Sequence, residues 1–400
     1  MLLEGLKVVE MATWVAGPGC AGLMADWGAD VVKVESAEGD ATRRFFPDTP
    51  ESPGNPIFSM ENRDKRGVVL DIARPDGRAA LVDILRTADV FVTNSRPGSL
   101  ARARLDHASL RDELPRLVYA TVTGYGLEGA EADAPAFDLT GFWTRSGVAA
   151  STIPPDQEPF VCRPGFGDHV TALAMLGGVL AALRERDLTG RGRLVEASLL
   201  RAGYYALSWD ASQHLRFGAA ATARPRSERP SALSGFFRAA DGGWFCLVPR
   251  GPACFGKLAA AIDRPELLEE ARFTPPIADL AVVRELRARL DEAFAGFTLA
   301  EIGRRLTRAD LIWAPMATLA DVEADPQARA AGCFVTTRDR FGGAFGAPAS
   351  PVRFPGTPPR VHAAAPALGE HTREVLRAAG YSRARIADLL RAGAAFQAPG

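Results

Sequence analysis

The sequence lacks the features that would place it at once in several common classes of protein. It has no excess of basic residues, since 47 basic side chains stand against 48 acidic ones and the net charge is −1. Nucleic-acid-binding proteins usually carry a basic excess or a basic run, so we expect no nucleic-acid partner. Lysine is scarce relative to arginine. The guanidinium group of arginine suits bidentate contacts with phosphate and carboxylate groups.

Cysteines are few and widely scattered, at Cys20, Cys162, Cys246, Cys254 and Cys333. Their spacings form neither a CxxC pair nor a zinc-binding set, so we expect no metal. An odd number of separated thiols is typical of reduced cysteines in a cytoplasm. The first residues do not form a signal peptide, and no run of about 18 uncharged apolar residues occurs. We therefore expect a cytoplasmic protein with no membrane partner.

Short β-rich runs alternate with helical patterns in the first half of the chain. The strand-like runs are 6–12, 29–35, 67–72, 89–93 and 117–123. Such alternation predicts an α/β fold with a doubly wound, mostly parallel, Rossmann-like sheet. We expect a large α/β domain at 1–205, a linker at 206–230, and a smaller α+β domain at 231–330 that contains a hairpin at 236–248. Residues 331–400 are expected to be a linker, with a proline-rich loop near 345–360, and a C-terminal segment that returns to the large domain.

A glycine-rich motif follows the first expected strand. The run from Gly17 through Gly19 to Gly22 fits G-x-G-x-x-G, and Glu35 ends the next strand, as in NAD-binding proteins. Pro18 has no amide hydrogen to donate, however, and the first glycine lies about five residues beyond the strand, whereas the fingerprint begins directly after it. An NAD-dependent oxidoreductase is therefore an alternative, and a tight turn before a helix N-terminus that can attract an anion is favoured.

Basic residues recur near the predicted strand ends and could form a rim that binds phosphate groups. They are Lys33, Arg43, Arg44, Arg63, Lys65, Arg66, Arg96 and Arg102. Ordinary solvated charges beside turns are the alternative interpretation.

Asp168 stands directly before an apolar helical run that starts near Val170. Aspartate is a preferred N-cap, so a capping role is one interpretation. The neighbouring Gly165 and Gly167 leave room for a ligand, and the helix dipole favours an ionised, nucleophilic carboxylate.

Taken in order along nearly the whole chain, these motifs resemble the class III CoA-transferases, which include formyl-CoA, crotonobetainyl-CoA and bile-acid CoA transferases. The matching segments include 23–35, 94–98, 124–126, 137–139, 167–168 and 368–372. The resemblance implies that coenzyme A moves from an acyl-CoA to a carboxylic acid through an aspartyl-CoA thioester on Asp168. It also implies that coenzyme A is a substrate, with no tightly bound cofactor, and that the chain forms an interlocked, ring-shaped homodimer.

The resemblance further implies where coenzyme A binds. Asn94, Ser95, Arg96 and Arg102 would contact it, with the arginines near its phosphates. Leu70 and Ala73 would lie beside the nucleotide, and Tyr125, Ala136 and Phe137 beside the pantetheine arm or the thioester. The turn at Val15 and Ala16 would approach the reacting carbonyl with its amides. Formyl-CoA transferase has glutamine at the position of Val15, which counts against formate or oxalate as a substrate.

The α-methylacyl-CoA racemases share the fold and are the nearest alternative. They pair the aspartate with a histidine where Phe137 stands here, and phenylalanine cannot exchange a proton, so Phe137 favours transfer. The segment 165–169 looks most like the branch that handles bile acids, aryl-lactates and 2-hydroxyacyl groups. We therefore expect a medium or large hydrophobic acid, with succinate or another small dicarboxylic acid as the alternative. No role is predicted for His169.

Overall fold

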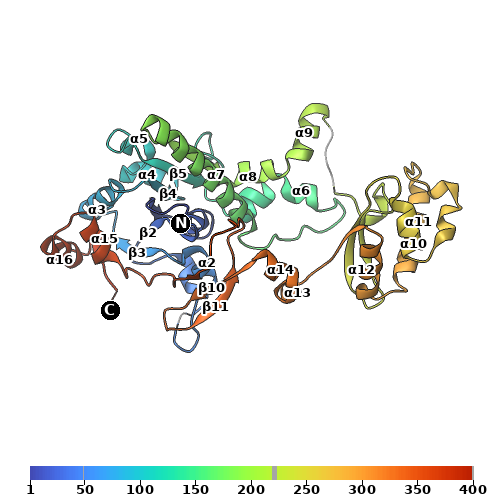
Figure 1. Cartoon of the computed structure of the whole chain (residues 1–400). Helices are drawn as coiled ribbons and strands as arrows, with labels where there is room; N and C mark the ends of the chain where they lie inside the picture. Colours follow the sequence, from blue (N-terminus) through green and yellow to red (C-terminus); the bar gives the residue numbers. More distant parts are fainter. Residues whose placement is uncertain (48, 219–222, 399–400) are drawn as a thin grey trace. The chain divides into compact units, whose positions relative to one another are not determined.

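The computed structural model describes residues 1–47, 49–218 and 223–398 (Figure 1). These residues form two compact units. Unit 1 comprises the described residues of 1–151, 159–221 and 329–400, and unit 2 those of 152–158 and 222–328. The stretch 206–230, predicted as a linker, contains helix α9 (Ser208–Phe217).

Unit 1 is built on a seven-stranded sheet with the order β13-β3-β2-β1-β4-β5-β6. The strands are β1 (Lys7–Met11), β2 (Asp30–Glu35), β3 (Arg66–Leu70), β4 (Val90–Thr93), β5 (Val118–Thr123), β6 (Leu194–Ser198) and β13 (Ala395–Phe396). Every neighbouring pair is parallel except β13 with β3. The predicted α/β class with a mostly parallel sheet is confirmed, and the five strands expected from the sequence are all present.

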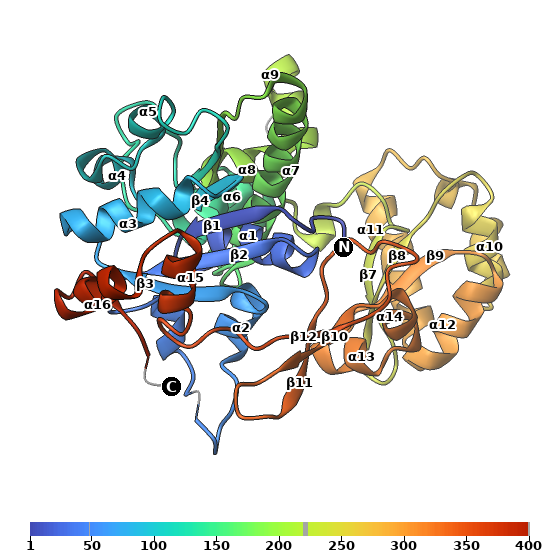
Figure 2. The same ribbon diagram turned by 60° about the vertical axis from the view of Figure 1, so that its left-hand side comes forward.

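Helices cover both faces of this sheet (Figure 2). On one face, α3 (Pro75–Leu85), α4 (Pro97–Ala103), α5 (His107–Leu110), α15 (Thr372–Ala378) and α16 (Arg383–Arg391) share a core with the strands. On the other face, α1 (Ala16–Asp26) and α7 (Phe166–Thr189) form the second core. Both faces of a parallel sheet are apolar, so each must be covered.

Within the part of the chain that the structure describes, α7 alone is long and apolar enough to cross a membrane by length and composition. Its buried side chains include Met175, Leu176 and Val179, which pack in the core shared with α1. The core helix of a large domain has the same composition, so packing against the sheet accounts for these apolar residues.

The last part of the chain adds a small sheet to unit 1. It consists of β10 (Phe334–Arg338), β11 (Ala344–Pro348) and β12 (Val361–His362), in the order β11-β10-β12. The proline-rich stretch near 345–360, predicted as a loop, therefore begins inside a strand. The prediction was wrong there because the prolines at β11 lie at its end, where no ladder hydrogen bond is lost.

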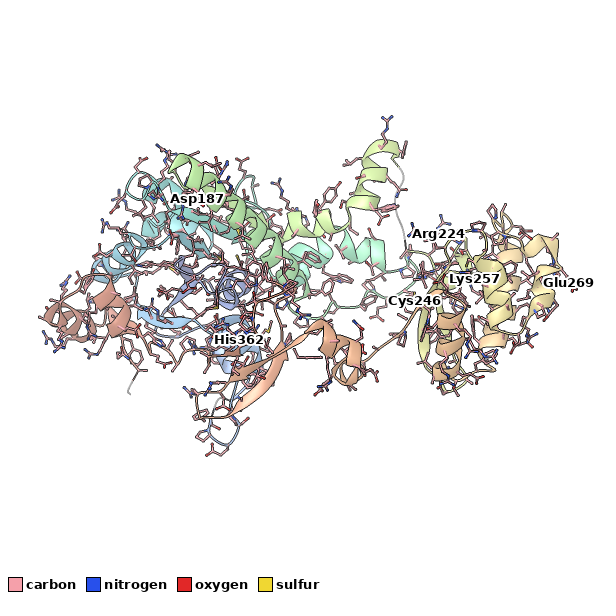
Figure 3. The ribbon with its side chains drawn as sticks, in the orientation of Figure 1. Asp187, Arg224, Cys246, Lys257, Glu269 and His362 are labelled. Carbon is pink, nitrogen blue, oxygen red and sulfur yellow. The ribbon has the colours of Figure 1, made fainter. Side chains whose placement is uncertain are left out.

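Unit 2 has its own core and a three-stranded antiparallel sheet of β7 (Gly235–Arg238), β8 (Trp244–Val248) and β9 (Ile312–Pro315). The predicted hairpin at 236–248 is confirmed. Phe237, Phe245 and Phe294 meet in the core, with ring centroids 4.8–5.9 Å apart. Helices α10 (Cys254–Ala261), α11 (Leu280–Phe294) and α12 (Leu299–Arg308) complete the unit, and Figure 3 labels Cys246 and Lys257 in it.

The remaining helices are shorter. They are α2 (Pro56–Asn62), α6 (Val148–Thr152), α8 (Leu199–Ala206), α13 (Leu319–Ala324), α14 (Pro326–Ala331), the π-helical turn η2 (Leu139–Thr144) and the 3₁₀ turns η1 (Ala41–Arg44), η3 (Arg226–Glu228), η4 (Pro265–Leu268) and η5 (Ala271–Phe273). In unit 1 the carboxyl ends of β1, β4 and β5 lead into the loops at 12–15, 94–96 and 124–138. Ligands of open α/β sheets bind at this edge.

Candidate active site

Asp168 is the third residue of α7, and Gly165, with φ of 81°, is the N-cap. The capping interpretation of Asp168 is therefore wrong. Its carboxylate makes no hydrogen bond or ion pair with any residue that the structure describes. It lines a pocket of about 470 Å³ together with Trp14, Ala16 and Phe137, which we call the nucleophile pocket.

The surroundings of Asp168 make it a weaker acid than an ordinary aspartate. Burial, followed by the nearby carboxylate of Asp138 and, to a smaller extent, that of Glu61, raises the pKa of Asp168 to about 7, while His169 opposes the rise. A carboxylate loses hydration when buried and is repelled by like charges, which is the physical cause. Perturbed pKa values of this kind are common at catalytic sites.

His169, next to Asp168 in the chain, is within hydrogen-bond distance of Glu61, and both residues lie close enough to Asp168 to influence its pKa. His169 Nε2 lies 2.8 Å from Oε1 of Glu61, whose side chain is 6% exposed against 51% for His169. The hydrogen bond to Glu61 raises the pKa of His169 above its ordinary value, against the opposing effect of burial. No role was predicted for His169, and Glu61 was not singled out, because 108 positions separate the two residues.

The loop between β1 and α1 is held in place by side chains from two other loops. The amide of Thr13 donates to Oδ1 of Asn94 at 3.0 Å, and Nδ2 of Asn94 donates to the carbonyl of Thr13 at 2.7 Å. Trp14 has φ of 68°, in the left-handed region, and its amide donates to Oδ1 of Asp40 at 3.3 Å. The side-chain amide of Asn94, a residue predicted to contact coenzyme A, thus holds this loop through two hydrogen bonds.

Val15 is the N-cap of α1, and Ala16, the first residue of that helix, lines the nucleophile pocket. Their backbone amides, and that of Gly17, have no acceptor among the residues that the structure describes. Free amides at a helix N-terminus stabilise negative charge. The predicted approach of this turn to the reacting carbonyl stays a prediction.

A second pocket, of about 390 Å³, lies at the carboxyl ends of β1, β2 and β3, and we call it the strand-end pocket. It is lined by Leu70, Ala73 and Ser95, three of the residues predicted to meet coenzyme A. Thr13 and Ser95 line both pockets, so the two adjoin. Together, the strand-end pocket and the nucleophile pocket extend from the carboxyl ends of β1, β2 and β3 to Asp168.

Two arginines predicted to contact coenzyme A have exposed side chains. Arg96 lines the nucleophile pocket. Arg102 lies in the last turn of α4 and donates to Oγ of Ser99 at 3.0 Å. Both guanidinium groups are accessible to a phosphate.

Most of the predicted basic rim is not available to a phosphate, and this part of the prediction was wrong. Lys33 and Lys65 are fully buried, and their ammonium groups lie 2.8 Å and 2.5 Å from the two carboxylate oxygens of Glu10. Three of the six arginines in the set pair with acidic side chains: Arg43 with Glu35, Arg63 with Asp26, and Arg66 with Asp30. The other three, Arg44, Arg96 and Arg102, are exposed.

The residues predicted to line the acyl arm divide between two places. Ala136 and Phe137 line the nucleophile pocket. Tyr125 lies in a different pocket with Glu196, and its ring is 5.5 Å from the guanidinium carbon of Arg145. The structure thus brings Ala136 and Phe137 to Asp168 but not Tyr125.

An aromatic cluster borders the nucleophile pocket. Phe137 is 55% exposed, and its ring lies edge-on to Trp14 with centroids 5.1 Å apart. Phe45 packs on the other side of Trp14 at 5.7 Å. The sequence did not single out Trp14 or Phe45, and no local signal could have found them, because tertiary packing brings them together.

The glycine motif serves helix packing. A Cβ at Gly17 would lie 2.6 Å from Cβ of Ala12, and one at Gly19 would lie 2.9 Å from Oε2 of Glu61. A Cβ at Gly22 would lie 2.7 Å from the carbonyl oxygen of Glu61. The glycines therefore let α1 approach α2 and the first strand closely, which accounts for them without a dinucleotide.

One group of side chains has the composition of a metal site. Oxygen and nitrogen atoms of Asp26, Asp64 and His362 lie within 4.8 Å of one another; Figure 3 labels His362, in β12. Asp26 accepts two hydrogen bonds from Arg63, and Asp64 accepts one from Arg360 and lies 2.6 Å from His362. Cationic side chains thus already neutralise both carboxylates, and the cluster ties the C-terminal sheet to the main sheet of unit 1.

Comparison with known proteins agrees with this geometry. The family model described as CoA-transferase family III matches residues 3–372. The chain is 33% identical to the (R)-2-hydroxy-4-methylpentanoate CoA-transferase of Clostridioides difficile, over 96% of this chain and 97% of that protein. It is 29% identical to the cinnamoyl-CoA:phenyllactate CoA-transferase of Clostridium sporogenes, over 97% and 96%.

A solved structure has the same fold. The CAIB/BAIF family protein from Brucella suis superimposes with a TM-score of 0.82 at 30% identity, covering 94% of this chain and 99% of that one. These likenesses favour neither the racemase nor the NAD-dependent alternative. The chain belongs to CoA-transferase family III and is an enzyme of that class.

Proposed function

We propose that the chain transfers coenzyme A from an acyl-CoA to a medium or large hydrophobic carboxylic acid through an aspartyl-CoA thioester on Asp168. The observation that carries this proposal is the carboxylate of Asp168, which has no protein partner among the described residues and lines a pocket that adjoins the strand-end pocket. A free carboxylate that is poorly hydrated is a better nucleophile than a solvated one, because less solvation is lost when it attacks.

The proposed reaction has four steps. Asp168 attacks the thioester carbonyl and releases the CoA thiolate, which leaves a mixed anhydride between the acyl group and the aspartate. The thiolate then attacks the aspartyl carbonyl and releases the donor acid, giving the aspartyl-CoA thioester. The acceptor carboxylate attacks that thioester, again releasing the thiolate and forming a new anhydride. Attack of the thiolate on the acceptor's carbonyl gives the product and returns Asp168 to the carboxylate form.

The free amides of Val15 and Ala16 support this sequence of steps. Each attack places negative charge on a carbonyl oxygen, and amides at the start of α1 can donate to it. Removing one such donor typically costs about 10²–10³ in kcat. These amides are already oriented by the contacts of Thr13 with Asn94 and of Trp14 with Asp40, so the loop does not need to reorganise during the reaction.

Coenzyme A is proposed to bind along the two adjoining pockets. Leu70, Ala73 and Ser95 would contact its nucleotide, and Ala136 and Phe137 its acyl end, as their positions in the two pockets support. Arg96, which lines the nucleophile pocket, and Arg102, which lies in the last turn of α4, would neutralise its phosphates, because both side chains are exposed. We propose that it acts as a substrate, with no tightly bound cofactor.

A hydrophobic acid is supported by the aromatic cluster and by the relatives. Trp14 and Phe137 offer ring surfaces in the pocket that Asp168 lines, and Phe45 packs against Trp14. Such surfaces suit a branched or aromatic acyl group better than oxalate or succinate. Two similar proteins are named for 2-hydroxy-4-methylpentanoate and for cinnamoyl-CoA and phenyllactate. Phe137 has no proton to exchange, so we expect no exchange of the substrate's α-proton into deuterated water, which a racemase would catalyse.

We also propose that the chain acts as an interlocked homodimer of ring-shaped subunits in the cytoplasm. Helix α9 has no buried residue in the single chain, and Trp209, Leu215 and Phe217 on it are 74–82% exposed. A second copy of the chain would cover these side chains. All five cysteines are free, which agrees with a reducing compartment. An interlocked dimer should keep its size on dilution, and a concentration-dependent monomer in sedimentation would contradict it.

The test of the proposed activity is a transfer assay with a panel of acids. Purified enzyme and an aromatic acyl-CoA are incubated with phenyllactate, 2-hydroxy-4-methylpentanoate, succinate or oxalate, and new thioesters are separated by chromatography. We expect transfer to the first two acids and its loss in Asp168→Ala. The matched control is Asp187→Ala, which changes an exposed aspartate at the other end of α7 (Figure 3). Activity of Asp168→Ala close to that of the control would refute the mechanism.

A further inference from the structure

We propose that Glu61 holds a protonated His169 beside Asp168 and that the charge of His169 favours the ionised form of the nucleophile, an inference that rests on the proposed role of Asp168. His169 and Glu61 act through Asp168 and are therefore positioning residues. Neither was assigned a role by the resemblance described above. The argument has a geometric part and an electrostatic part.

The geometric part concerns how the fold places Glu61. The residue lies near the end of α2, buried against α1, and its Oε1 is 2.8 Å from Nε2 of His169 in the first turn of α7. Gly19 faces the other carboxylate oxygen of Glu61, at 2.9 Å for an added Cβ, and Gly22 faces its backbone carbonyl. Gly19 thus leaves the space in which this carboxylate sits, and Gly22 leaves room for the backbone of the same residue. Any side chain at Gly19 would push the Glu61 carboxylate away from its present position.

The electrostatic part concerns the charges around Asp168. The groups that influence it are Asp138, at the start of η2, Glu61 on α2, and His169 on its own helix. Asp138 and Glu61 are both acidic and disfavour an ionised Asp168. Among the described residues that act on Asp168, only His169 favours the ionised form. The cationic state of His169 therefore offsets the two carboxylates.

The same charges decide whether His169 is protonated. Glu61 raises the pKa of His169 through the hydrogen bond and through its charge, and Asp168 raises it further. Lys65 is close enough to Glu61 to interact with it, and is itself paired with Glu10. His169 is half exposed, so the imidazole can exchange its proton with solvent. Glu61, His169 and Asp168 thus form a coupled set in which each negative charge helps to retain the proton on the imidazole.

This coupling can be measured without relying on activity. The chain has five histidines, so imidazole resonances in isotope-labelled protein can be followed by NMR against pH, with His169→Gln identifying the signal. We expect a lower pKa of His169 in Glu61→Gln and in Asp168→Asn, because each variant removes a negative charge beside the ring. An unchanged titration in both variants would overturn the proposal. Asp168→Asn also reports on the proposed function through its activity, so the two can fail separately.

Kinetics test the effect on the nucleophile. The plot of kcat/KM against pH reports the pKa values of the free enzyme. In the wild type its acidic limb should rise near pH 7, where Asp168 ionises. In His169→Gln we expect this limb to move to higher pH. If Asp168 becomes a roughly tenfold weaker acid, kcat/KM falls about fivefold at pH 7 and is nearly unchanged at pH 9. His107→Gln is the control, since His107 lines a different pocket near the starts of β5 and β6.

A double variant separates electrostatics from structural damage. His169→Gln alone leaves the buried carboxylate of Glu61 unpaired next to Asp168, whereas Glu61→Gln/His169→Gln removes both charges. We therefore expect the double variant to regain part of the activity lost at pH 7 by His169→Gln. Gly19→Ala should act in the same direction as His169→Gln, by displacing Glu61 from the imidazole. A pH profile of His169→Gln with the wild-type midpoint, or a double variant no more active than the single one, would contradict the proposal.

Discussion

The buried charges beneath the active-site loop allow a prediction with a defined magnitude. Glu10 binds two lysines at once, with Oε1 2.8 Å from Nζ of Lys33 and Oε2 2.5 Å from Nζ of Lys65, and all three side chains are 0% exposed. The same ammonium groups donate to the carbonyls of Ala12 and Pro18, at the two ends of the loop. We predict that Glu10→Gln destabilises the protein and loosens the loop that precedes α1.

The size of the effect follows from the burial. Removing one partner from a buried ion pair leaves an unpaired charge and typically costs about 3–5 kcal/mol. Lys33 keeps a second partner, because Asp40 lies 3.1 Å away, but Lys65 has no other acid within ion-pair distance among the described residues. Burial lowers the pKa of Lys65 already, whereas neighbouring acids overcome burial and raise the pKa of Lys33. Lys65 is therefore the group that Glu10→Gln leaves without an ion-pair partner, with only the weaker effect of the Glu61 charge in its favour.

The pH dependence gives this prediction a specific signature. Without Glu10 the folded protein binds the proton of Lys65 less tightly than the unfolded chain does. The unfolded chain then binds more protons between the folded pKa of Lys65 and about 10.4, so the stability of the variant rises with pH in that window. We expect the deficit against the wild type to narrow from pH 7 to pH 10. A deficit that does not depend on pH would assign the loss to packing and not to the charge of Lys65.

The assay is thermal and denaturant-induced unfolding, followed by circular dichroism. The control is Asp30→Asn, which breaks the pair of Asp30 with Arg66 on the same sheet, where the side chains are 45% and 26% exposed. Exposed pairs contribute about 0–1 kcal/mol, so the control should remain close to the wild type. If Glu10→Gln destabilises the protein no more than Asp30→Asn does, the assignment of Glu10 as the anchor of this loop is wrong.

Three further predictions concern the pockets. The pKa of Asp168 is raised in the folded state, so the stability that its protonated form contributes is present below about pH 4 and is lost as pH rises through about 7. Asp168→Asn should therefore melt several degrees above the wild type at pH 8 and close to it at pH 4. The expected difference in the free energy of unfolding is up to about 4 kcal/mol. Equal melting temperatures at pH 8 would contradict this. Arg96→Ala should raise KM for acyl-CoA about tenfold and leave kcat within about twofold. The control Arg111→Ala changes a residue outside both pockets and should alter neither constant. An unchanged KM in Arg96→Ala would place the phosphates elsewhere. Phe137→Ala should lower kcat/KM for an aromatic acyl-CoA about tenfold more than for acetyl-CoA, because the ring that packs on Trp14 is lost. Equal losses for both substrates would argue against a role of Phe137 in binding the acyl group.

The sheet could be predicted because its central strands are short, continuous apolar runs. Segments such as 30–35 and 118–123 are buried on both faces of the sheet. Their β-branched residues are typical of the buried strands of a parallel sheet. β6 was not predicted, because Leu194–Ser198 carries a glutamate and small polar residues. β13 has two residues, too few for any pattern.

The candidate site was predictable in part, where local sequence marks it. Asp168 stands out because glycines precede it and an apolar helix follows. Lys33 and Lys65 were misassigned because a lysine within a strand, or directly before one, looks the same in the sequence whether it faces solvent or a buried acid such as Glu10. Pairs such as Glu61 with His169 form only when α1, α2 and α7 pack together, so their partners cannot be identified from either segment alone.

The central claim is that Asp168 carries the acyl group and then coenzyme A. Its most direct test is to incubate the enzyme with acyl-CoA and hydroxylamine and to analyse the peptides that contain Asp168 by mass spectrometry. A mixed anhydride or thioester on the side chain would be converted to a hydroxamate, so we predict that the mass increase falls on Asp168 and disappears without acyl-CoA and in Asp168→Asn. Full transfer activity in the presence of hydroxylamine, with Asp168 unmodified throughout, would contradict the account.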